Sequence, residues 1–182
     1  SPAWLYVSKK IQKELQVPIQ GWFAQDAQFE MGPVFERAQN IRGFQIASPS
    51  LIGIRCVQTA FSMIKEAGID AIAQKAAVGT QMMIDLYDAW LAPLGFVLNT
   101  SRDPKERGGH ISLVHPDAAQ ICVAMREISN VIPDYRTPNS IRLAISPLPT
   151  SFVEVWDGFA RTRDLVASGQ YKTIKEGGSR VT

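Results

Sequence analysis

The residue best suited to chemistry in this sequence is an arginine in the strand-like segment 138–147. Side chains alternate along a strand, so Arg142 shares its face with the small residues Ala144 and Ser146. The apolar residues Ile141, Leu143 and Ile145 line the other face. A planar guanidinium on a rigid strand without bulky neighbours can bind a carboxylate through two parallel hydrogen bonds. From the pattern alone, the favoured interpretation is an arginine that faces solvent or pairs with an acidic side chain.

The other residue types that could do chemistry are few. His110 and His115 flank a strand-like run, and their odd separation sends them to opposite faces, so no shared metal site is predicted. His110 is interpreted as a packing residue at a strand end. Cys56 and Cys122 lack metal-like spacing and lie in apolar helical patterns, where thiols are usually inert.

Composition and charge exclude several classes of function. A length of 182 residues suits one domain or one and a part, and 46% hydrophobic and 20% charged residues are ordinary for a globular protein with a core. The net charge of +2 comes from scattered basic residues and argues against nucleic-acid binding. Neither a signal peptide nor a membrane span is recognised, and the two cysteines fit a reducing, cytoplasmic setting.

From residue 48 onward, four helices and four strands are expected to position these residues. The helices are expected from Ser48–Ser50 to Ala67, from Asp70 to about Leu91, from a cap at His115–Asp117 to about Glu127, and from Ser151 to about Ala167. The strands are expected at 96–100, 110–114, 131–135 and 141–145. The apolar stripe along the second helix, which includes Met83 and Trp90, is interpreted as packing surface. This order of elements predicts a small α+β unit with helices on one face of an antiparallel sheet.

The chain is expected to divide into four parts. They are a loop-rich end of a larger domain (1–68), a long connecting helix (69–94), the small α+β domain (95–168) and a flexible tail (169–182). Residues 1–7 form an apolar strand pattern without a polar lead-in, which suggests a fold whose earlier part is absent.

Six short motifs, in order, cover nearly the whole chain apart from the tail. They are Gly21-Trp22-Phe23 with 28–31, Gly43-Phe44 before Ser48-Pro49, 107–112 with His115-Pro116, 133–136, Ile141-Arg142 through 148, and 152–157. Together they resemble the C-terminal portion of kynureninase, especially its bacterial form. The resemblance implies an aspartate-aminotransferase-like fold, in which a large α/β domain that binds pyridoxal 5'-phosphate (PLP) precedes a small α+β domain. It also implies a homodimer with shared active sites and an amino-acid substrate: kynurenine or 3-hydroxykynurenine, cleaved to alanine and an anthranilate.

The resemblance also implies roles for four residues. Trp22 matches the tryptophan whose indole N–H donates to the cofactor phosphate, and Ser48 matches a second phosphate contact at a helix start. From the residues alone, Trp22 is interpreted as a packing residue and Ser48 as a helix cap, and Ser48 could both cap the helix and contact a phosphate. Arg142 matches the arginine that binds the α-carboxylate of the substrate, and Phe23 matches a residue that lines the pocket for its aromatic ring. In the family both phosphate contacts reach the cofactor of the neighbouring subunit.

Two departures from the family pattern bear on activity. Ala24-Gln25 stands where the family commonly has glycine and histidine, which leaves the preference between the two substrates open. The lysine that holds PLP as a Schiff base is expected upstream of Ser1, so the chain alone is predicted to be inactive. Lys9, Lys10 and Lys13 are interpreted as solvated charges.

Two other classes of function remain open. The first is another aminotransferase-like PLP enzyme, which would need a different carboxylate clamp or a reactive cysteine. The second is a non-catalytic interaction or dimerisation module, in which the apolar surface that faces the large domain would associate with a partner or a second copy.

Overall fold

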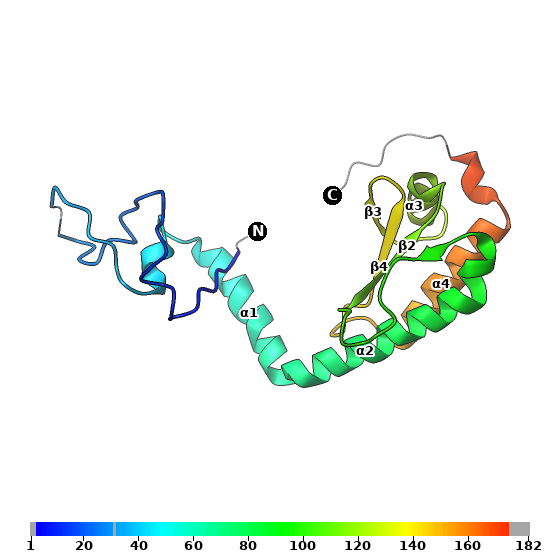
Figure 1. Cartoon of the computed structure of the whole chain (residues 1–182), viewed down its shortest axis with the longest axis horizontal. Coiled ribbons are helices and arrows are strands. Elements are labelled where there is room, and N and C mark those ends of the chain that lie inside the picture. Colours follow the sequence, from blue (N-terminus) through cyan, green and yellow to red (C-terminus); the bar gives the residue numbers. More distant parts are fainter. Residues whose placement is uncertain (1–2, 31, 175–182) are drawn as a thin grey trace. The chain divides into compact units, whose positions relative to one another are not determined.

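The computed structural model describes residues 3–30 and 32–174, which divide into two compact units with a boundary after Met63. The first unit is rich in loops, and the second contains the four-stranded sheet (Figure 1). Among the described residues, no helix is both long and apolar enough to cross a lipid bilayer.

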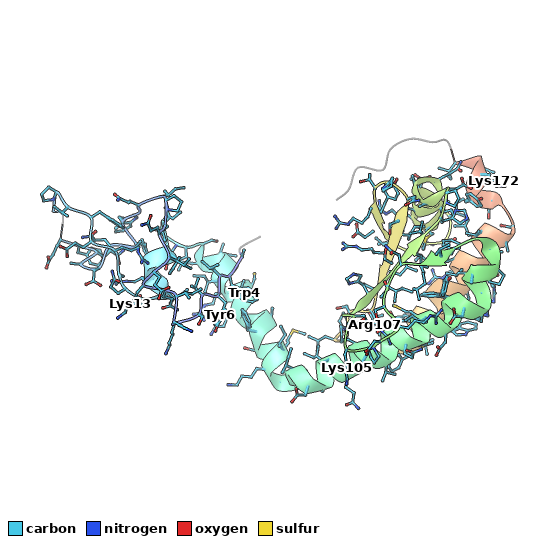
Figure 2. All side chains as sticks on the ribbon, viewed as in Figure 1. Trp4, Tyr6, Lys13, Lys105, Arg107 and Lys172 are labelled. Carbon is cyan, nitrogen blue, oxygen red and sulfur yellow. The ribbon has the colours of Figure 1, made fainter. Side chains whose placement is uncertain are left out.

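The first unit has little regular structure before its helix, as the sequence predicts. It contains a short 3-10 helix at Ile41–Phe44 and most of α1 (Leu51–Ala67). The strand expected at 1–7 is wrong in its described part: residues 3–7 are irregular, and residues 1–2 lie outside the described residues. Trp4, labelled in Figure 2, packs edge-on against Phe61 with ring centroids 5.6 Å apart. A strand needs a hydrogen-bonded neighbour, and none of the described residues pairs with this segment.

The predicted limits of α1 are confirmed, and local signals explain them. At its start, the Ser50 hydroxyl accepts a hydrogen bond from the Gly53 amide at 3.2 Å. At its end, Gly68 has a φ of 79°, a conformation that favours glycine and stops the helix.

The second unit is a small α+β fold, which confirms that part of the predicted fold class. Its elements are α2 (Ile69–Leu86), a π-helical turn (Tyr87–Leu91), a 3-10 turn (Ala92–Leu94), β1 (Val97–Leu98), β2 (His110–Val114), α3 (Ala118–Glu127), β3 (Asp134–Arg136), β4 (Ser140–Ala144), α4 (Phe152–Ala167) and a second 3-10 turn (Gln170–Thr173). The sheet is antiparallel with the order β1-β2-β4-β3. β1 is shorter than expected, and β3 begins three residues later than expected.

The two faces of the sheet differ as the alternation predicts. Leu113 of β2 and Ile141 of β4 are buried in one core together with residues of α2, α3 and α4, so the helices cover this face. Met83 and Tyr87 of the predicted apolar stripe also belong to this core. We call the opposite side the open face; its side chains are exposed or half-buried and include His110, Ser112, Asp134, Ser140, Arg142 and Ala144.

Two expectations near chain turns are wrong. The Asp117 side chain does not cap α3; its carboxylate accepts a hydrogen bond from the Tyr171 hydroxyl at 2.8 Å. The Asp117 amide instead donates to Nδ1 of His115 at 3.0 Å. Tyr171 is buried in the turn Gln170–Thr173, so the predicted tail does not begin at 169. The rest of that predicted tail, 175–182, lies outside the described residues.

Candidate functional site

Strand β4 places Arg142 in the middle of the open face. The register sets it directly opposite Asp134 on β3 and Ser112 on β2, so these three residues form one row across three strands. Its neighbours along β4 on the same face are Ser140 and Ala144, which are small. The Arg142 side chain is 37% exposed. The strand position and small neighbours predicted for this arginine are thus confirmed, whereas carboxylate binding stays a prediction.

Arg142 is paired with Asp134. Both Nε and Nη2 of Arg142 donate to Oδ2 of Asp134, with an Nε–Oδ2 distance of 2.8 Å. Nε of Arg136 donates to the same oxygen at 3.0 Å. Chiefly because Arg142 stabilises the charged carboxylate, and with help from Arg136, the pKa of Asp134 lies below its usual range. The ion-paired arginine considered from the sequence is therefore what the structure shows.

Two hydroxyl groups make the surroundings of Arg142 polar. The Ser112 and Ser140 Oγ atoms lie 2.6 Å apart, each next to Arg142 on the open face. A hydroxyl both donates and accepts, so this pair can adjust to an anionic ligand beside the guanidinium.

Trp22 and Phe23 lie in the first unit. Trp22 is 49% exposed and packs edge-on against Phe23, with ring centroids 4.7 Å apart. Trp22 borders a cleft of about 310 Å³ that Gln25 and Glu30 also line. Within the described chain, no group accepts a hydrogen bond from the Trp22 indole N–H, which is therefore available to a ligand.

A glycine contact brings Ser48 close to this aromatic pair in the fold. A Cβ atom on Gly21 would lie 2.0 Å from the Ile46 carbonyl oxygen, so the backbone before Trp22 lies directly against the backbone before Ser48. Ser48 is exposed, and its hydroxyl does not cap α1, because Ser50 does so. The helix-cap interpretation of Ser48 is therefore wrong, and the two predicted phosphate donors lie on adjoining segments.

The departure at Ala24-Gln25 has a structural role. Ala24 is buried, and its amide donates to the Gly21 carbonyl at 2.9 Å. Gln25 forms a bridge with Arg37, and its Oε1 accepts from the Glu36 amide at 2.9 Å. These two residues hold the loop that carries Trp22.

The remaining reactive groups are dispersed. Cys56 is exposed on α1, contrary to the apolar surroundings expected for it, whereas Cys122 is buried on α3, where burial raises its thiol pKa to about 12. Lys9, Lys10 and Lys13 are exposed, as expected for solvated charges, and Figure 2 labels Lys13. In the described ranges, no three His, Cys, Asp or Glu side chains gather as metal ligands would.

Sequence reasoning missed two interactions that organise the second unit. The first is the ion pair between Asp134 and Arg142. A hairpin with its turn at 137–139 places residue 134 opposite residue 142, and this signal could have indicated the pair. The second is Arg107, whose Nε donates to the Thr80 hydroxyl at 3.0 Å and whose Nη2 donates to Oε1 of Gln81 at 2.8 Å, which ties the loop before β2 to α2 (Figure 2). No local pattern marks that long-range contact.

The fold and these residues define a class, a small α+β domain with an arginine on its open face, preceded by a loop-rich unit with an exposed Trp-Phe pair. Residues 72–161 match the family model of the kynureninase C-terminal domain. The chain is 38% identical to the kynureninase of Geobacillus thermodenitrificans over 154 residues, which is 84% of this chain and 36% of that protein. It is 34% identical to the kynureninase of Bacillus thuringiensis subsp. konkukian over 175 residues, which is 95% of this chain and 40% of that protein. The chain belongs to the kynureninase family and carries its C-terminal domain.

The chain is much shorter than the two relatives. It spans 36% to 40% of the length of these two relatives.

Proposed function

We propose that this chain is the C-terminal portion of a PLP-dependent hydrolase that cleaves kynurenine or 3-hydroxykynurenine to alanine and an anthranilate. Membership of the kynureninase family supports the reaction class. The observation that carries the proposal is Arg142, a half-exposed guanidinium on a strand whose neighbouring side chains on the open face are small. Its role is to bind the α-carboxylate of the substrate.

The first unit offers groups that suit the phosphate of the cofactor. The Trp22 indole N–H and the Ser48 hydroxyl lie on adjoining segments, and neither has a hydrogen-bond partner in the described part of the chain. Both can donate to phosphate oxygens, and Phe23 would line the pocket for the substrate ring. When bound, PLP supplies the electron sink for the bond cleavage.

We also propose a cytoplasmic homodimer in which Trp22 and Ser48 contact the cofactor of the neighbouring subunit. The family relationship supports the dimer, and two free thiols fit a reducing compartment. Because the lysine that carries PLP is expected outside this chain, the 182-residue chain should not turn over kynurenine when PLP is added.

Substitution of Arg142 tests the proposal in a full-length protein that carries this sequence. Arg142→Ala should lower kcat/KM for L-kynurenine by about 100-fold or more, because a bidentate charged contact is lost. Arg142→Lys keeps the charge without the fork geometry and should cost about tenfold. The readout is the fluorescence of the anthranilate product.

The control is Arg102→Ala. Arg102 forms an exposed ion pair with Asp88, with N–O distances of 2.7 and 2.8 Å, and should be replaceable with little effect on kcat/KM. Unchanged kcat/KM in Arg142→Ala would refute the proposed role of Arg142.

A further inference from the structure

The guanidinium of Arg142 has two edges that can each hold a carboxylate. Its five N–H donors form a planar fork, with Nε and one Nη2 proton along the side and Nη1 and the other Nη2 proton at the end. Asp134 accepts from Nε and Nη2, so it occupies the side edge. Nη1 donates no hydrogen bond to any of the described residues, and the side chain is 37% exposed. The end edge is therefore available to a ligand.

The local charge also favours another anion. Two arginines, 136 and 142, share the single carboxylate of Asp134, so the three groups together carry one net positive charge. Ser112 and Ser140, on the same face, add no charge. A second carboxylate at the end edge of Arg142 would complete a neutral set of two arginines and two carboxylates.

We propose that Asp134 is a positioning residue for substrate binding: it holds Arg142 by the Nε edge and thereby aims the Nη1–Nη2 edge at the carboxylate of an α-amino-acid substrate. This inference rests on the proposed role of Arg142. Asp134 lies directly across the β3–β4 pair from Arg142, so backbone hydrogen bonds fix the distance between the two residues. A long, flexible side chain held in this way loses less rotamer freedom when the substrate binds.

The opposite role for Asp134 would be competition with the substrate for Arg142. The geometry argues against it, because the two carboxylates would use different edges of the guanidinium. The two roles predict opposite changes in KM when Asp134 is removed. Loss of a positioning group raises KM, whereas loss of a competitor lowers it.

The test compares Asp134→Ala and Asp134→Asn in the full-length protein. Asp134→Ala should raise KM for L-kynurenine about tenfold and change kcat less than about twofold. The reason is that the lost hydrogen bond to a charged group acts in substrate binding and not in the chemical step. Asp134→Asn should give an intermediate KM, because its amide oxygen can still accept from Nε. The control, Asp88→Ala, removes the carboxylate of the Arg102 ion pair and should leave KM unchanged.

A second readout does not depend on activity. In the 182-residue chain, the Nε–H signal of Arg142 in nitrogen-15 NMR should exchange slowly with water, and Asp134→Ala should abolish this protection while the circular dichroism spectrum is retained. Unchanged or lowered KM in Asp134→Ala would overturn the inference. If Arg142→Ala also leaves KM unchanged, the proposed function fails; if Arg142→Ala raises KM and Asp134→Ala does not, only the positioning role fails.

Discussion

Residues of the same type have different surroundings in this protein because the fold places them in different positions. Arg142 and Arg102 are both ion-paired, but Arg142 sits in the middle of a sheet face among small side chains, whereas Arg102 pairs with Asp88 at the surface. The sequence distinguishes these arginines, because strand alternation gives the small neighbours of Arg142 directly. It does not indicate the Asp134 contact, which depends on the pairing of two strands.

The two cysteines should differ strongly in reactivity. Because only the thiolate reacts, and burial raises the pKa of Cys122 to about 12, thiol–disulfide exchange of Cys122 with Ellman's reagent at pH 8 should be at least about 100-fold slower than that of exposed Cys56. Counting thiols with Ellman's reagent should give one fast thiol per chain, and the second only in denaturant. Cys56→Ser should remove the fast phase; a fast phase that persists in this variant would contradict the assignment.

Elements whose ends are set by nearby residues follow from the sequence, and elements that need distant partners do not. Gly68 ends α1 and Ser151 begins α4 where the sequence predicts. The strand expected at 1–7 is not formed in its described part, 3–7, because a strand requires a hydrogen-bonded partner. The Asp117 side chain does not cap α3, because its carboxylate accepts a hydrogen bond from the hydroxyl of Tyr171, 54 residues further along the chain.

The start of α4 offers a test of local stabilisation. The Ser151 hydroxyl accepts from the Glu154 amide at 3.2 Å, and the Glu154 carboxylate accepts from the Ser151 amide at 2.7 Å, which is a capping box. Ser151→Ala should lower the free energy of unfolding by about 1 kcal/mol in urea denaturation. The control is Ser168→Ala at the other end of α4, which should cost less than half as much; equal losses would show that the cap contributes nothing specific.

At the scale of the whole molecule, buried apolar residues are concentrated in the second unit. Of the buried hydrophobic residues, only Ala24 and Ala38 belong to the described part of the first unit. The first unit is held mainly by hydrogen bonds, such as those from Arg37 to the carbonyls of Gln12 and Leu15, both at 3.2 Å. Burial of apolar area is the dominant stabilising contribution in folding, so the two units should differ in local stability.

Hydrogen exchange should show this difference. Amides of β2, β4 and α3 should exchange slowest, and amides of residues 8–30 and 32–49 should exchange at least about 100-fold faster, because local opening there exposes little apolar surface. Mass spectrometry of deuterated peptides from the 182-residue chain measures both sets in one experiment. Equal protection in the two units would show that the first unit has a stability that its small core does not explain.

The contact between Tyr171 and Asp117 determines where the C-terminal domain can be cut. The family match ends at residue 161, inside α4, which continues to Ala167. The chain then turns back so that Tyr171 is buried against the start of α3, with its ring at right angles to that of His115 and their centroids 6.4 Å apart. A chain truncated at residue 161, where the family match ends, would end within α4. It would also lack Tyr171, so the space that this side chain fills beside α3 would be empty. The segment that matches the family model is thus shorter than the packed second unit.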